Sequence, residues 1–85
     1  MTETRILGLL ISDRIKEAGR TQVVLSRHAR IIRSRLGFHE VSEAKCSRAG
    51  IMVLHLTGSP DEWDALETEL SGIGGLQVQR ISFTY

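Results

Sequence analysis

Histidine and cysteine side chains are the residues of this chain best suited to bind a metal ion. His39 and Cys46 are seven positions apart, and His55 lies in the apolar segment that follows them. Thiolates and imidazoles bind zinc, nickel and copper, so a site shared between subunits is one interpretation. No pair has a metal-site spacing such as C-x2-C or H-x3-H. We favour a lone thiol and a buried or interface histidine, with metal sensing through His39, Cys46 and His55 as an alternative.

Positive charge is concentrated between residues 20 and 35. The basic side chains of this segment are Arg20, Arg27, His28, Arg30, Arg33 and Arg35. Arginines contact the phosphates of nucleic acids, which makes nucleic-acid binding a second alternative. However, no aromatic residue interleaves the arginines to stack on bases, and the whole chain has a net charge of only +1. A solvated helix end followed by a charged edge strand, which resists unwanted strand pairing, explains the segment more simply.

The sequence contains no recognisable catalytic set. It has neither a nucleophile elbow nor a glycine-rich phosphate loop ending in Lys-Ser/Thr. Asp61, Glu62 and Asp64 cluster where a helix is expected to begin, and there they complement the positive end of the helix dipole. Gly74-Gly75 follows a helix, whereas phosphate-binding loops precede one. We therefore expect a protein that is not an enzyme and has no cofactor.

Two apolar segments are predicted to form the centre of the fold. Residues 50–57 and residues 6–11 are almost uninterrupted apolar runs, which is typical of strands covered on both faces. The first strand is expected over residues 4–11, and the last over Leu76 to Tyr85, with Val78, Ile81 and Phe83 as its apolar members. The polar segment from His39 to Ala49 indicates a long hairpin connection with extended arms.

Two helices are expected between these strands. Ser12-Asp13 can cap a helix whose residues at helical spacing are Ile15, Ala18, Gln22, Leu25 and Ala29, with Val24 beside them. Residues 28–32 either finish this helix or begin a strand; the alternation of Ile32 through Leu36 favours an edge strand.

The second helix has a stronger start signal. Ser59 is the cap, Pro60 occupies the first helical position, and Glu62 completes a capping box. Its predicted buried stripe is Trp63, Leu66, Leu70 and Ile73, and the helix ends at Gly72 and Gly74-Gly75.

This order of elements predicts an α+β fold, a ferredoxin-like βαββαβ sandwich. Antiparallel pairing with right-handed crossovers gives a four-stranded sheet of order 4-1-3-2 with two helices on one face. The other face also carries large apolar groups, so we expect a protein partner to cover it, most simply a second copy in a homodimer or homotetramer.

Length and composition limit the classes of protein. The chain has 85 residues, of which 41% are hydrophobic and 25% charged, so we expect a single globular domain over residues 1–85. The only cysteine, Cys46, excludes an intramolecular disulfide and fits a reducing compartment. No signal peptide or membrane-spanning apolar run is evident. We therefore expect a cytoplasmic protein that does not bind membranes.

Four segments resemble a known family. They are Ile11-Ser12-Asp13-Arg14, Arg35-Leu36-Gly37-Phe38, the apolar strand at residues 51–56, and Leu66 through Val78. Together they resemble the small regulators encoded with iron-only hydrogenase systems, over residues 5 to 83. That family looks like the ACT-type regulatory fold and the C-terminal domain of nickel-responsive repressors. The resemblance implies a ferredoxin-like domain that pairs its sheets into dimers or tetramers and senses a small ligand.

Two departures limit what the resemblance implies. The hairpin from His39 to Ala49 is longer than the family pattern. The closely spaced His-x-His and downstream Cys of the nickel repressors are also missing, because His39 stands alone and Gly50 falls where that Cys would be. Nickel binding is therefore not carried over.

The resulting prediction is a non-enzymatic, oligomeric regulatory domain that binds a small effector or a protein partner. Arg14, Arg35 and Gly37 are its ligand or interface candidates because they match the family motif. Arg14 could equally pair with a neighbouring carboxylate, and Gly37 could simply permit a bulge or a positive φ.

Overall fold

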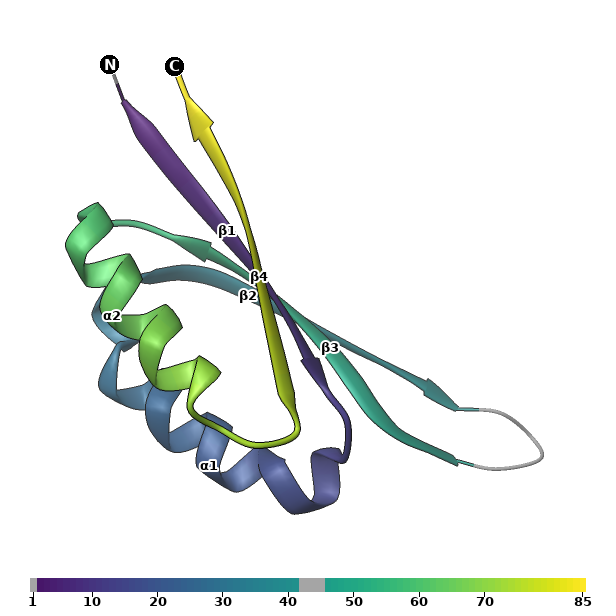
Figure 1. Cartoon of the computed structure of the whole chain (residues 1–85). Helices are drawn as coiled ribbons and strands as arrows, with labels where there is room; N and C mark the ends of the chain where they lie inside the picture. The colour runs from purple at the N-terminus through teal and green to yellow at the C-terminus, as the bar shows by residue number, and fades with distance from the viewer. Residues whose placement is uncertain (1, 42–45) are drawn as a thin grey trace.

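A computed structural model gives the structure of residues 2–41 and 46–85, without a description of the side chains of residues 14, 15, 38–41 and 46–48. Its elements are β1 (Glu3–Ile11), α1 (Arg14–Arg27), a 3₁₀ turn (Ala29–Ile31), β2 (Ile32–Val41), β3 (Cys46–Leu56), α2 (Pro60–Ser71) and β4 (Leu76–Thr84). The strands form one antiparallel sheet of order β2-β3-β1-β4, and both helices lie on the same side of it (Figure 1). The predicted ferredoxin-like α+β fold is confirmed, including the central positions of β1 and β3.

The start of α2 follows directly from its sequence. The Glu62 N–H donates to Ser59 Oγ at 3.5 Å, and the Ser59 N–H donates to Glu62 Oε1 at 3.2 Å. This is the predicted capping box, with Pro60 at the start of the helix. The predicted stripe is confirmed as well, because Trp63, Leu66, Leu70 and Ile73 are all buried.

The structure decides the boundary that the sequence left open between residues 28 and 32. Helix α1 ends at Arg27, a 3₁₀ turn covers Ala29–Ile31, and β2 begins at Ile32. The His28 N–H is shared between the carbonyls of Val24 and Leu25, at 3.3 and 3.2 Å, as the helix tightens into this turn. The segment therefore both ends the helix and begins the strand.

The structure confirms the extended arms of the hairpin predicted over residues 39–49, but the connection between them is shorter than predicted. The ladder pairs His39 with Gly50 and Val41 with Cys46, so β2 and β3 extend well into the segment expected to be a connection. The ribbons of both strands extend beyond the helices here (Figure 1), so polar composition was a poor guide to where the strands end. The connection that remains, residues 42–45, lies outside the described residues.

The predicted buried face of α1 was partly wrong. Ala18, Gln22 and Ala29 are exposed, whereas Glu17 and Thr21 are buried beside the expected Val24 and Leu25. The buried polar groups are satisfied: Thr21 Oγ1 donates to the Glu17 carbonyl at 3.0 Å, and Glu17 Oε2 accepts from Arg20 at 2.7 Å. A pattern based on apolar residues cannot anticipate a helix face that buries paired polar ones. The Ile15 side chain lies outside the described part of the chain.

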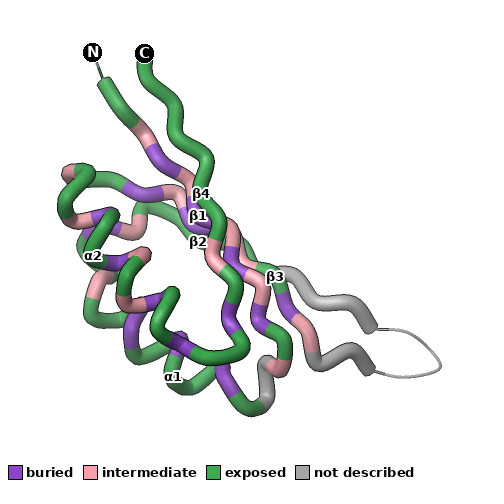
Figure 2. The backbone as a smooth tube through the Cα atoms, viewed as in Figure 1, coloured by how far each residue is buried: buried purple, intermediate pink, exposed green. Residues whose placement is uncertain are grey.

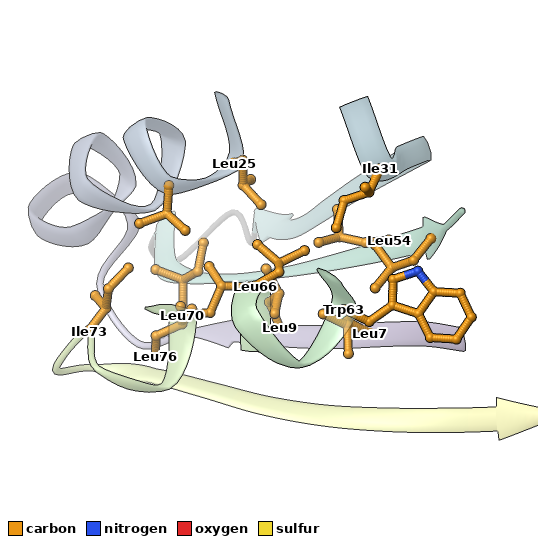
Figure 3. Packing of buried hydrophobic residues seen from close by; sticks show 13 residues of the cluster. Leu7, Leu9, Leu25, Ile31, Leu54, Trp63, Leu66, Leu70, Ile73 and Leu76 are labelled. Carbon is orange, nitrogen blue, oxygen red and sulfur yellow. The ribbon is translucent and has the colours of Figure 1, made fainter. Parts of the chain in front are cut away.

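One hydrophobic core lies between the helices and the sheet (Figure 3). The sheet contributes Leu7, Leu9 and Leu54, and the helices contribute Leu25, Leu66 and Leu70, among others. Trp63 belongs to this core, and its indole N–H donates to the Thr57 carbonyl at 2.9 Å. Among the described helices, none is long and apolar enough to cross a membrane.

Candidate functional site

The two faces of the sheet differ in what covers them. Burial alternates along β1 (Figure 2). Its buried members are Leu7, Leu9 and Ile11, which belong to the core shared with the helices, and Arg5, which contacts α2. Strand β4 is mostly exposed beyond Leu76. We call the side that faces the helices the covered face, and the opposite side, which no element of the described chain covers, the open face.

The register identifies the large apolar residues of the open face. They come from all four strands and are Ile6, Leu10, Leu36, Ile51, Val53, Ile81 and Phe83. Four are half exposed: Leu36 at 58%, Ile81 at 55%, Phe83 at 51% and Ile51 at 50%. Because no described element covers these residues, the open face is a candidate interaction surface.

The open face carries no charged side chain in the part of the chain that the structure describes. Its polar members are Thr4, Ser34, His55, Gln77 and Gln79. A quarter of all residues in the chain are charged, and the charged residues described on β1 and β4, including Arg5 and Arg80, are in register with the covered face. The absence of charge is therefore a property of this face and not of the whole surface.

His55 supplies a hydrogen bond on this face. Its Nε2 lies 3.1 Å from Thr4 Oγ1, and the ring is half-buried between neighbouring strands. The sequence predicted a buried or interface histidine, and this position is consistent with that. The described residues contain no group of three potential metal ligands, while the side chains of His39 and Cys46 lie outside the description. Metal sensing through these three residues therefore gains no support.

A hollow of about 240 Å³ opens on this face above Gly8. It lies between Leu10 and Ile51 on one side and Gln77 and Gln79 of β4 on the other. Gly8 has no positive φ, and a Cβ built on it would approach no atom more closely than the Gln79 carbonyl oxygen at 4.0 Å. The isolated chain therefore does not require glycine at this central position.

Most of the predicted arginine cluster is neutralised by acidic partners. Arg20 pairs with Glu17 at 2.7 Å, and Arg30 pairs with Glu62 at 2.7 Å. Arg27 and His28 both approach Glu69 Oε2, at 3.5 and 3.0 Å. Apart from the pair within α1, these contacts connect α1 and the 3₁₀ turn to α2, so much of the segment serves intramolecular contacts. That arrangement weakens the alternative of nucleic-acid binding.

Arg33 and Arg35 differ from the others. Arg35 donates from Nη2 to the neutral Gln22 Oε1 at 3.1 Å, and Arg33 is exposed with no ion pair among the described residues. Both residues line a groove of about 260 Å³ between α1 and β2. The register of β2 shifts between Ile32 and Ser34, at Arg33, so the strand is irregular where it borders the groove.

Sequence reasoning missed one buried charged cluster. Arg5 is 7% exposed, and its Nη1 donates to Asp64 Oδ1 at 2.7 Å and to Glu67 Oε1 at 3.0 Å. Its guanidinium carbon lies 5.2 Å from the centre of the Trp63 ring, while its buried Nε has no hydrogen-bond partner among the described residues. One signal was available: Arg5 falls in phase with Leu7 and Leu9, which places it on the buried side of β1.

The charge of Arg5 is stabilised by its partners. Burial acts to lower the pKa of the guanidinium, but the hydrogen bond to Asp64 and the negative charges of Glu67 and Asp64 outweigh this, and the pKa is raised. Arg5 therefore remains positively charged and anchors α2 to β1.

The other two residues of the family motif are Arg14 and Gly37. Arg14 begins α1, but its side chain is outside the description. Gly37 pairs with Met52 on β2, where a Cβ would meet nothing within 4 Å. The positive-φ glycines of the described chain are Gly58 and Gly75, and the register shifts of β2 lie on either side of Gly37, so neither a positive φ nor a bulge explains it. The structure brings Arg35 to a groove, and Gly37 follows it two positions later on the same strand and the same side of the sheet.

Comparisons with known proteins identify the fold. No family model and no curated protein matches the chain. An uncharacterized protein from Thermotoga maritima superimposes with a TM-score of 0.81 and 25% identity, covering 98% of this chain and 100% of that one. CPII from Thiomonas intermedia, described as a nitrogen regulatory PII-like protein bound to ADP, AMP and bicarbonate, has a TM-score of 0.60 and 9% identity, covering 99% and 93% of the two chains.

A third similar structure is a formyltetrahydrofolate deformylase from Pseudomonas putida. Its TM-score is 0.58 and its identity 10%, with 92% of this chain matching 28% of that one. At such identities, the similarity to CPII and to the deformylase extends to the fold alone. The chain thus has a ferredoxin-like fold that also occurs in PII-like proteins, and its functional candidates are the open face and the groove between α1 and β2.

Proposed function

We propose that this chain is a non-enzymatic regulatory domain that assembles through its open face and responds to a small effector. The observation that carries the proposal is the open face itself, which is apolar across four strands and uncharged wherever its side chains are described. Burial of apolar surface contributes about 25 cal/mol per Å², so contact across such a face favours association.

A second copy of the chain is the partner that best suits this surface. In a twofold interface each patch meets its own copy, so any charge near the axis would approach a like charge. The described part of the open face carries no charge and so avoids this repulsion. The hollow above Gly8 adds shape, because it can receive an apolar side chain of the opposing copy, and the isolated chain gives no other reason for the missing side chain.

Regulation would follow from linkage between effector binding and assembly. An effector that binds one assembly more tightly than another shifts the equilibrium by the difference in affinity. The sequence resemblance to regulators of iron-only hydrogenase systems supports a cytoplasmic role of this kind, in a dimer or a tetramer. CPII, which shares the fold, was solved with ADP, AMP and bicarbonate bound, and this supports ligand binding as a use of the fold.

The assembly is tested by native mass spectrometry and sedimentation velocity on protein purified without a metal-affinity tag. We expect a dimer or tetramer at tens of micromolar. Ile81→Lys places a charge on the open face and is expected to weaken association by at least about tenfold, a loss of about 1.4 kcal/mol. Val23→Lys is the matched control, because Val23 is an equally exposed apolar residue, at 58% against 55%, on α1 and away from this face.

Two outcomes would contradict the proposal. One is a monomeric wild-type protein at these concentrations. The other is equal weakening by Ile81→Lys and Val23→Lys, which would mean that the open face is not the interface. Urea unfolding of both variants provides the stability control, and a shift within about 0.5 kcal/mol is expected for each exposed substitution.

A further inference from the structure

We propose that the groove between α1 and β2 binds the anionic group of a small molecule, a carboxylate or a phosphate, through Arg33 and Arg35. The inference rests on the proposed effector-binding function and names the chemistry of the effector. These two residues differ from the other described arginines in lacking an acidic partner among the described residues.

Every other arginine with a described side chain has an acidic partner. Arg5 and Arg80 share Asp64 and Glu67, while Arg20, Arg27 and Arg30 pair with Glu17, Glu69 and Glu62 respectively. Arg33 and Arg35 form no ion pair within the described residues. Two cations without an acid at a single groove form a local excess of positive charge that an anion would neutralise.

The groove has the features needed to hold a small anion. Gln22 Oε1 accepts from Arg35 Nη2 at 3.1 Å, which leaves the other donors of this guanidinium available and fixes its orientation from α1. Ser26 adds a hydroxyl to the wall, and Leu25 and Ile32 supply apolar surface. A planar guanidinium binds two oxygens of a carboxylate or phosphate at once. The site therefore suits an acidic group attached to a compact apolar body.

A purely protective role is the simpler explanation. Strand β2 is an edge strand, and arginines on an edge resist pairing with other chains. That role requires charge but neither a groove nor a neutral amide that orients one of the arginines. The two explanations make different predictions for lysine, which preserves the charge and loses the bidentate fork.

A small molecule suits the groove better than a nucleic acid. Among the described residues that line the groove, no side chain is aromatic and able to stack on a base, and the groove volume is about 260 Å³. The arginines that could extend a phosphate track, Arg27 and Arg30, are already paired with Glu69 and Glu62. Binding to an oligonucleotide is therefore an outcome that the experiment must be able to detect.

The experiment is a titration of the full ¹⁵N-labelled chain with sodium phosphate, followed through the arginine Nε–Hε signals. Sodium chloride at matched ionic strength is the control for nonspecific screening. We expect saturable shifts of the Arg33 and Arg35 signals with phosphate and none with chloride. Acetate tests whether the site accepts a carboxylate as well as a phosphate, which distinguishes the two sources of the anionic group.

Matched charge variants locate the site. The double variant Arg33→Gln/Arg35→Gln is expected to lose about tenfold or more in phosphate affinity. Arg27→Gln/Arg30→Gln removes the same charge from the same segment and is expected to change the affinity less than about twofold, since its arginines are already paired. Arg33→Lys/Arg35→Lys, which keeps the edge charged, is expected to lose about threefold.

The inference is overturned if phosphate does not bind, or if both glutamine double variants weaken binding equally. It is also overturned if a single-stranded oligonucleotide binds more tightly than phosphate with a steep salt dependence that requires Arg33 and Arg35. Sedimentation of the same samples separates this result from the proposed function. Loss of anion binding in an intact oligomer removes only the effector chemistry, whereas a monomer that still binds phosphate removes only the assembly.

Discussion

The two faces of the sheet are built from the same strands but have opposite relations to the rest of the chain. On the covered face, Leu7 and Leu54 are completely buried, and the charged Arg5 is held by two carboxylates. On the open face, Leu36, Ile51, Ile81 and Phe83 are half exposed. The strands alternate their side chains between the two faces, so apolar residues in consecutive positions supply both.

This difference separates stability from function. Residues on the covered face contribute to the free energy of unfolding of the single chain, because their burial is complete without a partner. Residues on the open face contribute to it only when a partner removes them from water. Substitutions on the covered face should therefore change the urea unfolding of the single chain, whereas substitutions on the open face should mainly change association.

The largest effect is expected for Leu54→Ala on the covered face. Leu54 is 0% exposed in the core, and removing its buried methyl groups should lower the free energy of unfolding by about 2–5 kcal/mol. Ile51→Ala, on the same strand and on the open face, is the paired variant and should cost less than about 1 kcal/mol in an Ile81→Lys background, at a concentration where sedimentation velocity shows a monomer. Urea unfolding of both proteins makes the comparison, and equal losses would show that the two faces are not distinct.

An intermediate effect is expected for Arg5→Ala. The change leaves Glu67 without its close partner, removes the contact with Trp63 and should lower stability by about 1–3 kcal/mol. Because Trp63 is the only tryptophan, its fluorescence reports the same site during urea unfolding. Arg80→Ala is the control: Arg80 is 53% exposed and lies 3.8 and 3.9 Å from the same carboxylates, so its loss should remain within about 0.5 kcal/mol. A larger loss of stability for Arg80→Ala than for Arg5→Ala would contradict the role of Arg5 as the main partner of these carboxylates.

The smallest effect concerns Gly8 on the open face. In the monomeric background, Gly8→Ala should raise the free energy of unfolding by about 0.5 kcal/mol, since the position has ordinary backbone angles and room for a Cβ. Gly75→Ala is the opposite case. Its φ of 82° and a Glu17 Cγ at 3.3 Å from the added Cβ predict a loss of about 1 kcal/mol or more.

In the wild-type background, Gly8→Ala should also weaken oligomer formation, because the methyl group enters the hollow that we assign to the opposing copy. Sedimentation velocity measures this. If Gly8→Ala assembles normally, the hollow is not part of the interface, and the interface depends on the apolar side chains alone.

Much of the fold could be predicted because its signals are local. Ser59 and Glu62 begin α2 through hydrogen bonds within four residues, Pro60 fits the first helical position, and the apolar runs at 6–11 and 50–57 indicated the central strands. The face of α1 could not be predicted in the same way. Glu17 and Thr21 make their hydrogen bonds within α1 itself, to Arg20 and to the Glu17 carbonyl, but their burial is set by how the helix packs, which a pattern of apolar residues does not indicate.

Of the two candidate sites, the open face could be predicted from the sequence and the groove between α1 and β2 could not. The apolar open face followed from residue types along the strands. The groove did not, because Arg35 meets Gln22 across thirteen positions and two elements, and the different behaviour of Arg33 and Arg35 is visible only once the acidic partners of the other arginines are known.

The sequence by itself determined the order of elements, the central strands, the capped second helix and a sheet with two apolar faces, because these depend on residue type and on spacing along the chain. The tertiary structure alone decided which arginines are neutralised, how Arg5 is buried against α2 and which residues line the groove between α1 and β2. Those properties depend on distances between side chains far apart in the sequence, and packing against the sheet sets these distances.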